Sequence, residues 1–155
     1  MSLDIKNIIQ DTIFICKKHL ERMNFAKAKI HPLFPLKEDV FNHLAPENVA
    51  YVDQFIGRFS KLQDAMGGKL FPQVLELTQE VNSPAFIDKL NKLEKIGAIS
   101  SAAEWTELRA MRNSFAHDYP TDITISMETL NQAFIDSIKL ENFLTSCLKF
   151  IAKYP

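Results

Sequence analysis

Glycine and cysteine are scarce in this chain, and no charge of one sign dominates it. Only four of the 155 residues are glycine and 46% are hydrophobic, which favours a packed globular protein and argues against disorder. The 18 lysine and arginine residues are balanced by 19 acidic ones. The chain therefore has no overall basic field for nucleic acid, and binding of RNA or DNA requires a local cationic patch.

Several common types of chemical site are also missing. Cys16 and Cys147 form no Cys-x-x-Cys pair and fall on apolar helical stripes, so we expect reduced core residues. The four histidines show no metal-ligand spacing. Gly67-Gly68 has no Lys-Ser/Thr partner for a phosphate loop, and no Gly-x-Ser-x-Gly elbow occurs. We expect neither a metal nor a cofactor.

The chain lacks targeting and membrane signals as well. It begins Met-Ser-Leu-Asp, without the basic and then apolar layout of a signal peptide. No apolar run approaches the ~20 residues that span a bilayer. We expect a cytoplasmic protein without membrane contact.

The apolar residues recur with helical spacing, and no segment alternates as an exposed strand does. We expect an all-α fold in a single domain, 1–155. About five helices are predicted, which cover roughly 3–29, 47–77, 84–96, 101–119 and 124–153.

Local signals mark the ends of these helices. Pro46 suits a helix start, and Gly67-Gly68 should kink or end the second helix because glycine costs ~1 kcal/mol relative to alanine. Asn82-Ser-Pro is typical of a cap followed by a first-turn proline, and Gly97 is a good helix stop. Ser101-Ala-Ala-Glu104 is a capping box that opens the fourth helix.

The end of the fourth predicted helix, Met-Arg-Asn-Ser-Phe-Ala-His-Asp-Tyr-Pro (111–120), is unusually rich in polar side chains. On an ideal helical wheel Arg112 falls between Trp105 and Leu108, in the middle of an apolar stripe. A guanidinium there requires an anionic partner or a water-filled cleft, because an unpaired buried charge is very costly. A structural salt bridge to a carboxylate of another helix is one interpretation, and a reaction centre is the other.

His117 lies about 140° around and ~7.5 Å along an unbroken helix from Arg112. The two side chains converge only if the last turn unwinds, or if they meet across two subunits. As chemistry, the set fits metal-independent phosphodiester transfer: histidine moves a proton near neutral pH, and arginine binds phosphate and stabilises transition-state charge. Asn113 would orient the histidine or bind a phosphate oxygen, and Tyr119 offers a hydroxyl and a stacking face. Each residue alone also has an ordinary structural explanation.

The pattern Arg112-Asn113-x-x-x-His117-x-Tyr119 in a small all-α chain resembles the HEPN superfamily, and within it the HepT toxin group. The segment 86–99 that precedes the fourth helix is similar to this group too. The resemblance implies an up-and-down bundle that forms a homodimer, with two Arg/His motifs in a shared cleft that acts as a metal-independent ribonuclease.

It further implies roles for single residues and a partner. His117 would be the general acid and base, Arg112 the transition-state cation, and Tyr119 the site at which a small nucleotidyltransferase, the antitoxin, adds AMP. Arg109, Asn113 and Asp118 are candidates for binding the substrate, an RNA or a nucleotide. RNA affinity would depend on a few cations, among them Arg58, Arg109 and Arg112.

Two alternatives stay open. The chain is either a non-catalytic nucleotide- or substrate-binding partner subunit of a nucleotidyltransferase, or a helical adaptor whose Arg112 is a core salt bridge. The first predicts co-purification with that enzyme. The second predicts a loss of several kcal/mol of stability in Arg112→Ala, as for one half of a buried pair.

The last predicted helix carries apolar residues on two faces. Phe143 and Phe150 lie off its main stripe, so they predict either a partner surface or cover by a neighbouring segment. Phe14 and Phe25 on the first helix raise the same question. The main stripe itself is expected to include Leu130, Phe134, Ile138, Leu140, Leu144, Cys147, Leu148 and Ile151.

Overall fold

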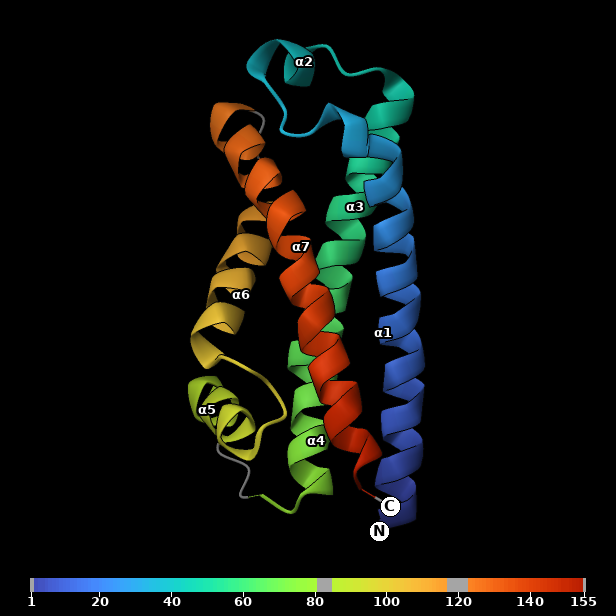
Figure 1. The fold of residues 1–155 in the computed structure, drawn as a ribbon, viewed down its shortest axis with the longest axis vertical. Coiled ribbons are helices and arrows are strands. Elements are labelled where there is room, and N and C mark those ends of the chain that lie inside the picture. The colour runs from blue at the N-terminus through green and yellow to red at the C-terminus, as the bar shows by residue number, and fades with distance from the viewer. Residues whose placement is uncertain (1, 81–84, 117–122, 155) are drawn as a thin grey trace.

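Four long helical rods run alternately up and down and are connected by shorter elements (Figure 1). The computed structural model describes residues 2–80, 85–116 and 123–154, and within these ranges it contains helices and no strands. The predicted all-α bundle is confirmed. In chain order the elements are α1 (Ser2–Ile30), the 3-10 turn η1 (His31–Leu33), α2 (Glu38–Asn42), α3 (Pro46–Ala65), the π-helical segment η2 (Met66–Leu70), α4 (Phe71–Leu77), α5 (Phe86–Ile96), α6 (Ala102–Ala116) and α7 (Ile123–Ala152).

The pairing of α1 with α3 is the most extensive helix contact in the fold. Side chains that recur every three or four residues on each helix meet at this contact and are buried. On α1 these include Ile9 and Met23, and on α3 they include Phe55 and Phe59. Burial of each such side chain contributes roughly 1.5–3 kcal/mol relative to exposure. The buried residues of all the long helices belong to one hydrophobic cluster.

The glycine pair lies in the π-helical segment η2, which interrupts the regular α-helix without ending the predicted helix. The chain passes from α3 through η2 into α4 as one rod (Figure 1). Gly67 lies directly against the indole of Trp105, since a Cβ atom built on it would be 3.2 Å from Trp105 Cζ2. The close approach of a large aromatic ring and the burial of Met66 and Leu70 beside it outweigh a glycine cost of ~1 kcal/mol.

The connection between α5 and α6 is built by caps that the sequence predicts. Gly97 ends α5 in the left-handed conformation, with φ of 87°. The Ser101 hydroxyl accepts a hydrogen bond from the Glu104 N–H at 3.1 Å, which is the N-cap bond of the predicted capping box. The Glu94 carboxylate accepts a further bond from the Ala102 N–H at 2.6 Å. These bonds fix the start of α6; the predicted cap at Asn82 lies outside the described residues.

The buried face of α7 differs from the predicted stripe. Ile138 is 49% exposed, whereas Phe143, expected on an outer face, is 2% exposed. The reason is tertiary: α6 packs along α7, and the Trp105 ring meets Phe143 edge to face at 5.2 Å. Phe150 is half-buried against Tyr154. Of the two alternatives that the sequence leaves open, cover by a neighbouring helix is the one observed at Phe143.

The proline-rich segment between α1 and α3 folds onto α7. Phe34 stacks on Phe134, with ring centroids 3.9 Å apart. The Asn131 side chain accepts a hydrogen bond from the Leu36 N–H at 2.7 Å and donates one to the Leu36 carbonyl at 3.0 Å. The segment thus closes one end of the core. Phe14 and Phe25 of α1 remain exposed.

Both cysteines are fully buried and unpaired, as expected. Burial raises the pKa of the Cys16 thiol to about 11 and that of Cys147 to about 12. Among the helices that the structure describes, none is long and apolar enough to cross a bilayer.

Candidate functional site

Arg112 on α6 is held by Asp64 on α3 in a bidentate, side-on pair. Its Nε donates to Asp64 Oδ1 at 2.8 Å, and its Nη2 donates to Asp64 Oδ2 at 2.7 Å. The pair lies at the edge of the core, because the Arg112 side chain is 25% exposed and that of Asp64 is 50% exposed. Asp64 is thus the anionic partner that the wheel position of Arg112 requires.

The position of the guanidinium corrects one detail of the sequence-based analysis. Trp105 and Leu108 are fully buried, as expected, but Arg112 between them is not. Long cationic side chains beside a core commonly keep their charged group toward water in this way. The pair is therefore not a core salt bridge, and it stands where a ligand can reach it.

The side-on geometry leaves part of the guanidinium free for a ligand. Only Nε and one Nη2 hydrogen are directed at Asp64, so both Nη1 hydrogens and the second Nη2 hydrogen point elsewhere. The hydrogen bonds to Asp64 raise the pKa of Arg112 further above its ordinary value. The group is a permanent cation in a fixed orientation, which suits recognition of a phosphate.

A pocket of about 380 Å³ adjoins this pair, and we call it the Gln63 pocket. It lies among α3, η2, α4, α5 and α6, and Asp64 belongs to its wall. Arg109, one turn before Arg112, lines it with its guanidinium carbon 4.5 Å from the centre of the Phe86 ring. The lining residues are Gln63, Asp64, Gly67, Gly68, Pro72, Phe86, Lys89 and Arg109.

The structure describes only some of the other residues that the sequence predicts for the site. Asn113 is exposed on α6, next to Arg112 in the chain. His117, Asp118 and Tyr119 lie outside the described residues. The structure therefore brings Arg112 and Arg109 to one region and does not describe the remainder of the motif.

Arg58 does not join these cations. Its Nη1 donates to His19 Nδ1 at 3.0 Å, on the side of α3 that faces α1. Burial lowers the pKa of His19, and the positive charge of Arg58 lowers it further. His19 therefore stays neutral and accepts this bond, so that Arg58 serves the α1–α3 contact.

Sequence reasoning missed Gln63, Asp64 and Lys89. Gln63 and Asp64 follow Ser60 and Lys61 in a mixed polar and apolar part of α3, so the sequence does not set them apart. Only the packing of α3 against α6 shows that Arg112 is the partner of Asp64. Among the described residues, no three His, Cys, Asp or Glu side chains gather closely enough to hold a metal ion.

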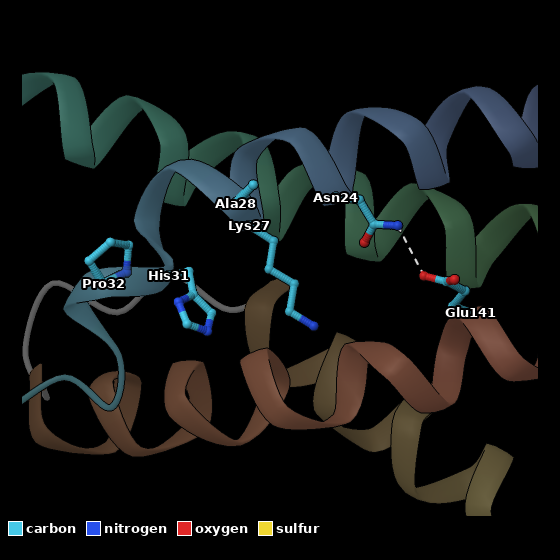
Figure 2. A pocket seen from close by; sticks show the side chains of 6 residues that line it. All are labelled: Asn24, Lys27, Ala28, His31, Pro32 and Glu141. Carbon is cyan, nitrogen blue, oxygen red and sulfur yellow. Dashed lines mark hydrogen bonds between the residues drawn. The ribbon is translucent and has the colours of Figure 1, made fainter.

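A second pocket, of about 470 Å³, lies between the C-terminal end of α1 and α7 (Figure 2). Asn24 donates to Glu141 at 3.0 Å on one side, and Lys27 and His31 extend toward α7 on the other. The Lys27 ammonium lies 5.2 Å from the centre of the Phe134 ring. Partial burial lowers the pKa of Lys27, and Glu141 opposes that effect. Of the residues predicted for the site that the structure describes, none lines this pocket.

The bundle thus offers one fixed, partly accessible arginine beside a cationic pocket. No protein-family model matches the chain, and no curated protein and no solved structure has significant similarity to it.

Proposed function

We propose that the chain is a metal-independent endoribonuclease of the HEPN type, the toxin of a pair whose antitoxin is a small nucleotidyltransferase. The observation that supports the proposal most is the side-on pair of Arg112 and Asp64. It orients a permanent cation while leaving other N–H groups for a phosphate. The spacing from Arg112 to His117 and Tyr119 supplies the rest of the argument.

In the proposed reaction His117 takes the proton of a ribose 2′-hydroxyl. The 2′-oxygen attacks phosphorus, a P–O2′ bond forms, and the P–O5′ bond breaks. A protonated His117 returns a proton to the leaving 5′-oxygen, and the products are a 2′,3′-cyclic phosphate and a 5′-hydroxyl. Arg112 stabilises the charge that grows on the phosphate oxygens. Arg109, Asn113 and Asp118 bind the adjoining RNA.

The active form in this proposal is a homodimer. In the proposal, Arg112 of one copy and His117 of the other form each reaction centre. The helical course of α6 through Ala116 supports this arrangement, because positions 112 and 117 of an unbroken helix lie about 140° apart. RNA cleavage by this mechanism needs no metal ion. Ribonuclease activity that persists in the presence of a metal chelator is therefore the property that distinguishes it.

The test is RNA cleavage by purified protein in EDTA. The wild type should cut single-stranded RNA and leave 2′,3′-cyclic phosphate ends, whereas Arg112→Ala and His117→Ala should each lose about 100-fold or more in rate. Arg22→Ala removes the same charge from an exposed position of α1 and should cut normally. If wild type and His117→Ala leave RNA equally intact, the proposal fails.

A second candidate is a non-catalytic partner subunit of a nucleotidyltransferase. It is favoured by the Gln63 pocket, whose volume lies within the ~300–1,000 Å³ of small-molecule sites. Here the pocket holds a nucleotide, or the chain presents Tyr119 to the enzyme. Co-purification with that enzyme, and a mass gain of whole AMP units that Tyr119→Phe abolishes, would support it. Intact RNA in the cleavage test would then select it over the ribonuclease.

A further inference from the structure

Gln63 contributes a polar side chain to the wall of the Gln63 pocket. Gln63 lies on α3 and is 3% exposed, yet its side chain lines the pocket. Its side-chain amide forms no hydrogen bond with the described residues. The fully enclosed polar atoms without a partner among those residues are Gln73 Oε1 and Trp105 Nε1, so the Gln63 amide is open to the pocket. A ligand that offers a donor and an acceptor side by side can pair with it there.

The pocket also carries a flat cationic surface. The guanidinium of Arg109 lies over the Phe86 ring at 4.5 Å, an arrangement on which a planar aromatic ligand stacks. Lys89, half-buried on α5, adds a second positive charge. The negative charge of Asp64 is balanced by Arg112, so the mouth of the pocket keeps a net positive charge.

The position of the pocket relates it to the reaction centre. Gln63 is followed in the chain by Asp64, which holds Arg112. A ligand whose flat part lies against Gln63 and the Arg109–Phe86 pair can therefore extend an anion along the Asp64 wall toward Arg112, which Asp64 holds. A volume of about 380 Å³ is at the low end of ligand sites, which suits one nucleotide unit.

We propose that the Gln63 pocket binds one base of single-stranded RNA through the Gln63 amide and the Arg109–Phe86 stack, and so places the next phosphate at Arg112. The inference rests on the proposed ribonuclease function for the identity of the ligand as RNA. Base edges present paired donors and acceptors that a side-chain amide matches, and base stacking on such surfaces tolerates sequence.

The first test is calorimetric titration of the full chain with the four ribonucleoside 3′-monophosphates and with ribose 5-phosphate, which has the anion but no base. At least one nucleotide should bind tenfold or more tightly than ribose 5-phosphate. If none does, the inference is overturned without any variant. Arg109→Gln should weaken binding of that nucleotide about tenfold.

Two variants address the pocket directly. Gln63→Met keeps the side-chain length without the amide, and it should abolish the preference for nucleotide over ribose 5-phosphate. Gln54→Met is the matched control, because Gln54 is on the same helix but bonds to the Arg22 carbonyl; it should bind as wild type does. Gly68 lines the pocket, and a Cβ atom built on it has open space around it for at least 4 Å. The side chain of Gly68→Leu should therefore enter the pocket and block it. Unchanged nucleotide binding in Gly68→Leu or Gln63→Met would overturn the inference.

The outcomes separate this inference from the ribonuclease proposal. Nucleotide binding that needs Gln63, together with intact RNA in the cleavage test, rejects the ribonuclease and keeps the pocket as a nucleotide site. Cleavage of RNA together with equal binding of nucleotides and ribose 5-phosphate rejects the base-binding pocket and keeps the ribonuclease. If the ribonuclease proposal and the base-binding pocket are both correct, Gln63→Met should change the base preference of cleavage. His117→Ala should then leave nucleotide binding intact.

Discussion

At the scale of single residues, the Arg112–Asp64 pair determines what the site can do. A guanidinium free to rotate would lose conformational entropy on meeting a phosphate. The Arg112 guanidinium, held by the Asp64 carboxylate at 2.8 and 2.7 Å, has already lost this entropy before the phosphate binds. The sequence predicts that Arg112 needs an anionic partner, since Trp105 and Leu108 flank it on the wheel. It does not identify Asp64, because 48 residues separate the two in the chain.

The exposure of this pair leads to a stability prediction. Arg112→Ala should lower the free energy of unfolding by only about 1 kcal/mol or less, as for other solvent-accessible ion pairs. Urea denaturation followed by the fluorescence of the single tryptophan, Trp105, measures this. A core salt bridge, as in the adaptor hypothesis, would instead cost ~3–5 kcal/mol. A loss of that size would contradict the placement of Arg112 at an accessible edge.

At the scale of elements, the sequence predicts where helices begin and end better than it predicts which face of each helix is buried. Pro46, Gly97 and the Ser101–Glu104 box mark ends that the structure confirms, because each acts through local backbone geometry. The glycine pair predicts an irregularity in the second helix, but its close contact with Trp105 does not follow from the local sequence, because Trp105 comes from another helix. Ile138 is exposed and Phe143 is buried, the reverse of the expectation, for the same reason. Packing against α6, and not the period of α7, decides which face of α7 is buried.

The two glycines of η2 should respond to alanine in opposite ways. Gly68→Ala adds a methyl group to open space and should raise the melting temperature by about 2 °C, since it removes flexibility from the unfolded chain. Gly67→Ala directs a methyl group at Trp105, whose ring is held by Phe71 and Phe143. It should cost ~1–3 kcal/mol. Scanning calorimetry of both variants measures this, and equal shifts would show that η2 does not owe its shape to Trp105.

At the scale of the whole molecule, one hydrophobic cluster holds the rods together and brings two distant segments to one edge. The Gln63-Asp64 step of α3 and the Arg109–Arg112 turn of α6 meet only because α3 and α6 pack together. Composition and periodicity predict the bundle. They cannot predict this pocket, since its walls come from five elements whose relative rotation depends on the packed core.

In the proposed dimer each reaction centre is shared between two copies, and mixing two inactive variants tests this. If each reaction centre takes Arg112 from one copy and His117 from the other, exchange of subunits between Arg112→Ala and His117→Ala should restore roughly a quarter of wild-type cleavage, since half of the dimers are mixed and each has one complete centre. Each variant alone should stay inactive. Mixtures that remain inactive after demonstrated subunit exchange would contradict a centre shared between copies.

The central claim is that Asp64 orients Arg112 for cleavage of RNA. The most direct measurement is kcat/KM for RNA cleavage in EDTA by the wild type, Arg112→Ala, Asp64→Ala and the double variant. We expect Arg112→Ala to lose about 100-fold or more, Asp64→Ala to lose at least tenfold, and the double variant to lose no more than Arg112→Ala, because Asp64 acts only through Arg112. Losses that multiply in the double variant, or a wild type that leaves RNA intact, would contradict the claim.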